Sequence, residues 1–314
     1  MKIKIERYCD TDKNKWDEFL DSSKNSHFFF KRDYLEYHKN RFKDFSLLIY
    51  KDDTLISLLP ANIDNHTLYS HQGLTFGGLI VNTKIKLETM LEIFTSLKEF
   101  LSSYHVEKLI YKPSPTIYHK YPAQEDLYAL SLNNAKLIKR ELISTIDLTK
   151  PIKYSNGRKW SIKKSKKLSL SVRQSDEIES FWYLLCDVLK SNHNSEPTHT
   201  LKDLQYLFDK FPNNIKLYFS HDKDTLLAGA LLFENEQLSH LQYVANSKKG
   251  RKMGALDLII DTLILKSKEE NKKYFSFGTS SAKNDIGINL GLIDQKERFG
   301  AFGVMQDRYE LKLL

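Results

Sequence analysis

A polar pair before a glycine-rich turn is the first place in this sequence where residue types suggest chemistry. His71 and Gln72 follow an apolar run and precede Gly73, Gly77 and Gly78. Glycines at such a turn let the backbone approach a ligand closely or bend tightly. A histidine there can accept a proton near neutral pH, and a glutamine can orient a substrate. The alternative is a buried polar pair that satisfies the backbone of the loop.

A loop interrupted by prolines, over residues 111–126, is a second candidate. Such loops commonly carry binding residues, and a carboxylate with a raised pKa can accept a proton from an incoming ammonium. Glu125 is the candidate base, and Tyr111, Lys112 and Tyr118 are candidate substrate-binding residues. Further substrate-binding candidates in the second half of the chain are Tyr243 and Asn289. Ordinary hydrogen bonds of a core explain the last two equally well.

Composition limits the class of protein. The chain has 314 residues, 41% of them hydrophobic, which is more apolar material than one average domain needs. No apolar stretch approaches the ~20 residues of a membrane span, and the first residues lack the apolar core of a signal peptide. Two cysteines, Cys9 and Cys186, are too few for a disulfide framework or a zinc site. We therefore expect a cytoplasmic protein without a metal.

The formal net charge of +8 is concentrated in one segment. Residues 151–171 contain seven basic side chains and no acidic one, and a helix is expected over 156–167. A local patch favours a phosphate-bearing ligand over a general DNA-binding surface. Trp160 is the only aromatic residue within the expected helix, so a stacking platform for single-stranded nucleic acid is not predicted.

Within this helix, Arg158, Lys163 and Lys164 are candidate ligands for the phosphates of a nucleotide-linked acceptor or of tRNA. Lys159, Lys163 and Lys167 share one helix face, because they are spaced four residues apart. A solvated helix face is the alternative for most of these lysines.

The same order of elements occurs twice along the chain. The segments 45–60 and 217–233 each predict a β-hairpin with an Asp-rich turn, offset by 171 residues (224 − 53). Around them we expect helices over 34–42 and 201–211, third strands over 67–71 and 238–244, amphipathic helices over 86–101 and 255–268, and final strands over 106–111 and 274–277. This order predicts an α/β protein (an α+β mixed sheet) with two modules, 1–150 and 151–314. The basic helix begins the second module.

The duplicated order resembles the GNAT-type acyltransferase fold in its two-module, FemAB-like form. Three stretches carry the resemblance: Ser70-His-Gln-Gly-Leu-Thr-Phe-Gly-Gly78; Lys112-Pro-Ser-Pro-Thr-Ile-Tyr118 with Pro122-Ala-Gln-Glu-Asp126; and a C-terminal block of Phe277-Gly-Thr-Ser280, Asn289-Leu-Gly-Leu292 and Gln295-Lys-Glu-Arg-Phe-Gly300. Together they span nearly the whole chain. The resemblance implies two tandem GNAT-like modules, each a central mixed sheet flanked by helices.

The resemblance implies a site for the pyrophosphate of CoA before the second long helix. The segment Lys248-Lys-Gly-Arg-Lys-Met-Gly-Ala255 keeps glycine and basic residues but does not match the family's loop spacing. Amides at a helix start point outward and carry the positive end of the dipole, which favours an anion. The candidate ligands are Lys249, Gly250, Arg251, Gly254 and Ala255. The alternative is a basic turn with a helix cap.

Lys296 is the strongest catalytic candidate that the resemblance implies. In the FemAB-like pattern the matching lysine is associated with charge stabilisation near the reacting centre, and Phe299 shapes the pocket. The alternative is a surface lysine paired with Glu297 or Asp294. Direct transfer needs no covalent nucleophile, which agrees with the lack of a persuasive Ser-His-Asp or Cys-His pattern.

The resemblance implies an acyltransferase, and Lys296, His71 and Glu125 are the candidate catalytic residues. The expected reaction moves an acyl group, acetyl from acetyl-CoA or another acyl from its acyl-CoA, to an amino group of a carbohydrate-type or nucleotide-linked acceptor. One alternative is a FemAB-like transferase that uses aminoacyl-tRNA and acts on a cell-envelope precursor. Another is a non-catalytic binding module with the GNAT fold. The acceptor, the acyl chain length and the oligomeric state stay open.

Overall fold

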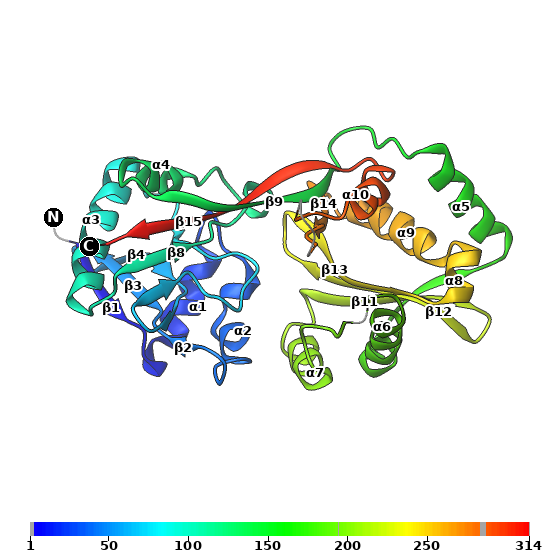
Figure 1. Cartoon of the computed structure of the whole chain (residues 1–314), viewed down its shortest axis with the longest axis horizontal. Coiled ribbons are helices and arrows are strands. Elements are labelled where there is room, and N and C mark those ends of the chain that lie inside the picture. Colours follow the sequence, from blue (N-terminus) through cyan, green and yellow to red (C-terminus); the bar gives the residue numbers. More distant parts are fainter. Residues whose placement is uncertain (1–2, 194, 283–286, 314) are drawn as a thin grey trace. The chain divides into compact units, whose positions relative to one another are not determined.

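A computed structural model describes residues 3–193, 195–282 and 287–313, and it contains two compact units (Figure 1). Unit 1 comprises Met1–Glu141 and Met305–Leu314, and unit 2 comprises Leu142–Val304. Two long strands, β9 (Lys136–Asp147) and β15 (Phe302–Lys312), have residues in both units. The chain therefore enters unit 2 along β9 and returns to unit 1 along β15.

Unit 1 contains a four-stranded antiparallel sheet in the order β1-β3-β4-β7 and a second ladder in the order β15-β8-β6-β5-β2. Its strands are β1 (Ile3–Arg7), β2 (Lys43–Asp44), β3 (Leu47–Lys51), β4 (Thr54–Leu59), β5 (Asn62–Asp64), β6 (Thr67–Tyr69), β7 (Ile80–Val81) and β8 (Lys108–Tyr111). Its helices are α1 (Lys13–Asp21), α2 (Arg32–Glu36), α3 (Leu87–Ser103) and α4 (Glu125–Leu132), with 3-10 turns η1 (Asp10–Asp12), η2 (Phe28–Phe30) and η3 (Thr116–Tyr118).

The core of unit 1 forms where α3 buries its apolar stripe. Met90, Phe94, Leu97 and Leu101 recur at helical spacing and are almost completely buried. They belong to one cluster with the inward residues of β3 and β8, such as Leu47. Burial of this stripe fixes α3 against the strands of unit 1.

Unit 2 is a mixed sheet in the order β10-β11-β12-β13-β14-β9. Its strands are β10 (Ser171–Ser175), β11 (Ile215–Asp222), β12 (Thr225–Glu234), β13 (Leu238–Asn246) and β14 (Tyr274–Thr279). Its helices are α5 (Asn156–Lys167), α6 (Ile178–His193), α7 (Leu201–Lys210), α8 (Lys248–Met253), α9 (Ala255–Glu269) and α10 (Leu290–Glu297). Figure 1 shows α9 on one face of this sheet and α6 and α7 on the other. Strands β13 and β14 are parallel, and α9 is the crossover between them.

The two predicted hairpins and most of the predicted helices are confirmed. Strands β3 and β4, and β11 and β12, pair antiparallel at the expected positions. The expected 156–167, 201–211, 86–101 and 255–268 helices are α5, α7, α3 and α9. The expected 34–42 helix is shorter, since α2 ends at Glu36. In the first half, the expected third strand (β6) pairs with β5 and β8 instead of extending the hairpin, and β7 pairs with β4.

Within the described residues, no helix is both long and apolar enough to cross a membrane.

Candidate active site

The candidate site lies where two parallel strands of unit 2 separate. Strands β13 and β14 are paired from Leu238↔Tyr274 to His240↔Ser276. Beyond that point β13 continues to Asn246 as the partner of β12, while β14 continues to Thr279 beside β9. In these described segments the facing backbone groups of β13 and β14 do not pair with each other. Backbone groups at such an opening can bind an extended ligand.

Lys296 lies at the end of β14. Its ammonium donates hydrogen bonds to the carbonyls of Gly278 (3.0 Å) and Thr279 (2.7 Å). The residue is 7% exposed, and burial lowers the pKa of its amine from 10.5 to about 8. A lysine ammonium has three donors, so these two bonds leave one for a ligand. Lys296 is therefore not a surface lysine paired with a neighbouring carboxylate. It belongs to α10 and is one of the buried residues of that helix.

Polar residues that the sequence did not reveal lie on the same two strands, and His240 is close enough to Lys296 for the lysine to lower its pKa. His240 of β13 shares a hydrogen bond of 3.1 Å with the Ser276 hydroxyl, and burial, with a smaller effect of Lys296, lowers its pKa to about 4. The Cε1 atom of His240 would lie 3.1 Å from a Cβ placed on Gly278, which has a φ of 68°. The hydroxyl of Ser280 is buried without a hydrogen-bond partner in the described part of the chain. A histidine at an inner strand position gives no spacing signal that could have identified it.

The predicted Phe299, Asn289 and Tyr243 all belong to unit 2. Phe299 is buried against Phe277, with ring centroids 5.9 Å apart. Asn289 is the N-cap of α10, where its side-chain oxygen accepts from the Leu292 amide at 3.0 Å. The hydroxyl of Tyr243, on the separated part of β13, is 2.7 Å from His199 Nδ1. Phe299 and Asn289 thus position the helix that carries Lys296, and their contact with a substrate stays a prediction.

The predicted CoA loop forms the short helix α8. Its N-cap Ser247 accepts from the Gly250 amide at 3.0 Å, so a side chain of the protein already binds this helix start. Lys249 pairs with Asp222 at 2.7 Å, and the Arg251 guanidinium donates to the Asn246 carbonyl at 3.2 Å. These basic side chains are engaged in contacts within the protein.

The N-terminus of α9 is covered by α5. Gly254, with a φ of 75°, would place a Cβ 2.6 Å from Ser165 Oγ and 2.7 Å from Ser161 Oγ, and Ala255 is fully buried. The Ser165 hydroxyl donates to the carbonyl of Gly254 at 2.8 Å. In the first turn of α9, Asp257 already places a carboxylate near the positive end of the dipole. This packing argues against an anion at this helix start, and CoA binding by residues 249–255 stays a prediction.

Arg158 and Lys164 of α5 have partners within unit 2. The Arg158 guanidinium is 2.6 Å from an oxygen of Asp257 and lies 4.7 Å from the centroid of the Phe299 ring. Lys164 donates to the Lys252 carbonyl at 2.8 Å. Both residues attach α5 to neighbouring helices. The third predicted residue, Lys163, is exposed along one side of a groove.

In unit 1, His71, Gln72 and Lys112 lie around the Gly-rich turn. His71 is 3% exposed and has a φ of 67°, and its ring stacks on His38 with centroids 4.9 Å apart. Burial, followed by His38 and Lys112, holds its pKa well below 6.5. Gln72 exchanges two 2.7 Å hydrogen bonds with Asn62, and the ammonium of Lys112 donates to the Leu74 carbonyl. These contacts match the alternative interpretation, a polar pair that supports its loop.

The other unit 1 candidates are also engaged in internal contacts. The Tyr111 hydroxyl is fully buried, donates to Asp126 at 2.6 Å and accepts from the Leu79 amide at 2.6 Å. Tyr118 is buried against the Phe76 ring. Glu125 pairs with Lys24 at 2.6 Å. The described contacts do not join Glu125 to His71, and Lys296 belongs to unit 2, so the three catalytic candidates do not form a cluster within either unit.

In the part of the chain that is described, no group of three or more His, Cys, Asp and Glu side chains is arranged to hold a metal ion.

Comparison with known proteins identifies the fold. No protein-family model matches the chain, and no curated protein matches it significantly. Solved structures do match. FemX superimposes with a TM-score of 0.70 at 12% identity, over 98% of this chain and 97% of FemX. L-PGS from Bacillus licheniformis gives a TM-score of 0.63 at 12% identity, over 96% of this chain and 91% of that one.

A tandem GNAT protein from the clavulanic acid biosynthesis pathway also matches, with a TM-score of 0.54 at 10% identity, over 100% of this chain and 99% of that one. The chain therefore has a GNAT-type, FemAB-like fold, a mixed α/β architecture as the order of its elements predicts.

Proposed function

We propose that this chain is a transferase that moves an aminoacyl group from aminoacyl-tRNA to an amino group of a second substrate, at the opening between β13 and β14. The observation that carries the proposal is the Lys296 ammonium, which is buried and held by two main-chain carbonyls. A fixed cation with one free donor is suited to an oxyanion that develops during acyl transfer.

The reaction is a direct substitution at a carbonyl carbon. The amine nitrogen of the acceptor bonds to the carbonyl carbon of the aminoacyl ester, and the negative charge that collects on the carbonyl oxygen is stabilised by Lys296. The bond from that carbon to the ribose oxygen then breaks, and the proton lost by the amine ends on the ribose hydroxyl. No covalent intermediate with the protein is required.

The choice of an aminoacyl ester over acetyl-CoA follows from the packing of α5. GNAT enzymes with CoA need free amides at the helix start after the fourth strand, and here Ser161 and Ser165 contact that position and Ala255 is buried. The FemAB-like form, which the sequence resembles, uses aminoacyl-tRNA as its donor, and two solved structures with this fold are consistent with that choice. FemX has the highest TM-score given above, and the C-terminal domain of a putative lysylphosphatidylglycerol synthetase from Agrobacterium fabrum gives a TM-score of 0.57 at 11% identity, over 82% of this chain and 81% of that one.

A transfer assay with charged tRNA, together with a titration with acetyl-CoA and CoA, tests this proposal. The purified protein is incubated with tRNA charged with a mixture of labelled amino acids and a panel of amines that includes amino sugars, and label transferred to an amine is counted. We expect transfer above the rate without protein. Calorimetric titration with acetyl-CoA and CoA is expected to show no binding. Micromolar binding of acetyl-CoA, with acetyl transfer to an amine of the panel, would contradict the proposed donor and favour the acyl-CoA expectation.

A further inference from the structure

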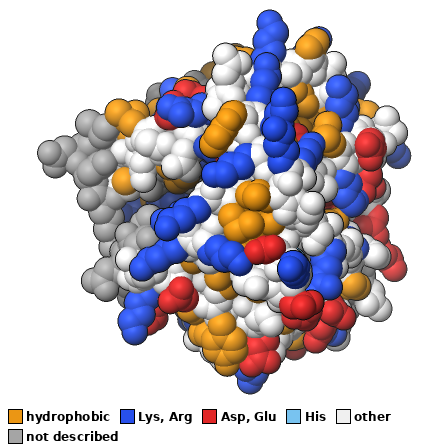
Figure 2. Space-filling model, turned by 90° about the vertical axis from the view of Figure 1, so that its right-hand side faces the viewer, with side chains coloured by type: hydrophobic (Ala, Val, Ile, Leu, Met, Phe, Trp, Pro, Cys, Tyr) orange, Lys and Arg blue, Asp and Glu red, His pale blue; other side chains and the backbone are white. Residues whose placement is uncertain are grey.

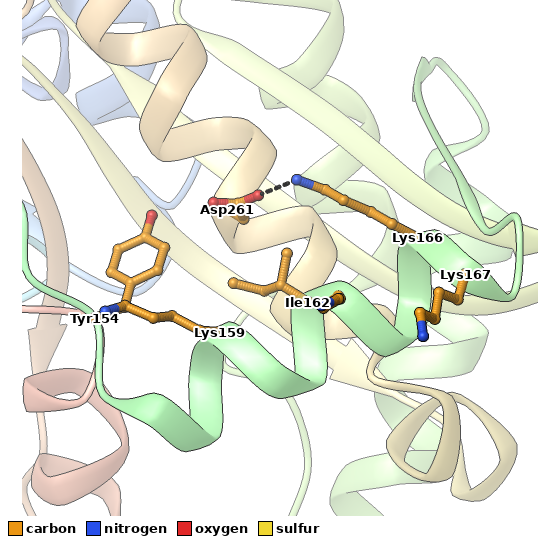
Figure 3. Close-up of a pocket in the computed structure, with 7 residues that line it drawn as sticks. Tyr154, Lys159, Ile162, Lys166, Lys167 and Asp261 are labelled. Carbon is orange, nitrogen blue, oxygen red and sulfur yellow. Dashed lines mark hydrogen bonds and ion pairs between the residues drawn. The ribbon is translucent and has the colours of Figure 1, made fainter.

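The exposed face of α5 forms one side of a cationic groove that the reaction at Lys296 does not use. The groove has a volume of about 530 Å³ and lies between α5 and α9 (Figure 3). Tyr154 and Ile162 line it, and among the described residues Asp261 of α9 is the one carboxylate in its lining. Lys166 forms an ion pair with that carboxylate, with its Nζ 3.1 Å from Asp261 Oδ2.

The other three lysines of this groove are available to contact a ligand. Lys159, Lys163 and Lys167 are exposed, and the described part of the chain offers none of them a carboxylate within ion-pair distance. They are spaced four residues apart on α5, so successive members are separated by about 6 Å along the helix. Figure 2, which shows the side of the molecule with α5 and α8, has Lys and Arg side chains across much of the face, and Asp and Glu mostly along its right and lower edges.

We infer that this row of lysines binds the phosphodiester backbone of the RNA that carries the proposed donor. The inference rests on the proposed function for its choice of RNA. A row of three cations about 12 Å long matches several successive phosphates of a strand, whereas a single phosphate or a diphosphate contacts one or two of them. Contacts of this kind position a nucleic acid without reading its sequence.

A membrane surface fits this face less well. A helix that lies on a bilayer needs a continuous apolar face beside its cations. Ile162 of α5 is buried inside unit 2, and the Lys164 ammonium lies 5.2 Å from the centroid of the Trp160 ring. Within the described chain, the large apolar side chains left exposed on α5 and at its end are Trp160 and Leu168, which do not make such a face.

The test measures RNA binding as a function of salt. Binding of a fluorescent RNA stem with a single-stranded 3′ end is followed by anisotropy between about 50 and about 300 mM salt, over which the Debye length falls from roughly 14 to roughly 6 Å. The variant carries Lys159→Gln, Lys163→Gln and Lys167→Gln. The control variant carries Lys190→Gln, Lys202→Gln and Lys210→Gln, three exposed lysines of α6 and α7 in the same unit.

Each phosphate contact contributes about 0.7 to 0.9 to the slope of log K against log salt, so loss of three contacts should reduce the slope by about 2 to 3. We expect this change in the α5 variant and the wild-type slope in the control. An unchanged slope in the α5 variant, or an equal change in both variants, would overturn the inference. Binding of wild-type protein to phosphatidylglycerol vesicles but not to RNA, lost in the α5 variant, would overturn it in favour of a lipid headgroup.

A third variant, Lys296→Met, separates this inference from the proposed function. It is expected to keep the wild-type RNA slope while it loses transfer. Transfer that persists in Lys296→Met would refute the proposed function. A wild-type slope of log K against log salt in the α5 variant would refute the RNA-binding surface alone.

Discussion

Two buried lysines of this protein make similar hydrogen bonds but have different surroundings. Lys296 of unit 2 and Lys112 of unit 1 both donate to main-chain carbonyls, and burial lowers the pKa of each, to about 8 and about 7. Lys296 lies at the end of β14, where β13 and β14 no longer pair with each other. Lys112 instead ties the Gly-rich turn to β8. The surroundings of the two ammonium groups therefore distinguish a candidate catalytic residue from a structural one.

The role of Lys112 predicts a pH dependence of stability. Burial lowers its pKa from the ordinary lysine value of 10.5, which the unfolded chain keeps, to about 7 in the folded protein. Between these two values the unfolded chain binds more protons, so the contribution of Lys112 to the free energy of unfolding rises with pH from about 7 to about 10.5. In urea unfolding from about pH 6.5 to about pH 9.5, the stability of the wild type should increase relative to Lys112→Met.

The control for this series is Lys84→Met, at an exposed position of unit 1. A difference between the wild type and Lys112→Met that stays constant over the whole pH range would show that Lys112 does not carry the effect.

At the residue scale, the sequence supported some candidates better than others. Lys296 became a candidate because the local run that ends in Phe299 and Gly300 resembles the C-terminal block of the FemAB-like form. The partner of Arg158 could not, because Asp257 lies 99 residues away in the chain. Spacing within one helix shows which cations share a face, but it does not show which of them another helix already binds.

The contact between α5 and α9 is the element-scale feature on which the proposed donor rests. Gly254 separates α8 from α9, and a Cβ at this position would meet Ser161 and Ser165 of α5. Its φ of 75° lies in the left-handed region that favours glycine. The packing of α5 over the N-terminus of α9 therefore depends on a glycine at position 254.

We predict that Gly254→Ala lowers the free energy of unfolding by about 1 to 3 kcal/mol, because the new methyl group meets two serine hydroxyls and the backbone becomes strained. Gly157→Ala is the matched control on α5, where an added Cβ has no neighbour within 4 Å. That change should be neutral or stabilise by about 0.5 to 1 kcal/mol, since alanine favours a helix. Both are measured by urea unfolding, and equal losses in the two variants would contradict the close contact.

Periodicity predicted some elements and missed others. The hairpins and α3, α5 and α9 have clear apolar spacing or caps, and their positions follow from it. Strand β9 begins with five exposed residues, and β15 has little alternation between buried and exposed positions, so neither gives a strand signal. The pairing of β6 with β8 depends on contacts about 40 residues apart, which local patterns do not contain.

At the scale of the whole molecule, the order of elements was enough to predict the fold class. Two runs of helix, three strands, helix and strand imply mixed sheets with a crossover. Proteins with a GNAT-type, FemAB-like fold superimpose on nearly the whole chain. The order could not predict that β9 and β15 belong to both units, since this depends on which strands pair. The donor and the acceptor are set by side chains on this fold, not by the fold itself.

The transfer rate of Lys296→Met, compared with Lys272→Met, tests the central claim most directly. Lys272 is a matched control, because it is also a largely buried lysine of unit 2 that donates to a main-chain carbonyl, that of Asn235, at 2.9 Å. With aminoacyl-tRNA and the accepted amine at about pH 7, Lys296→Met should transfer about 10²-fold more slowly or worse, as after removal of an oxyanion donor. Lys272→Met should keep the wild-type rate. A wild-type rate in a folded Lys296→Met protein would contradict the proposed site.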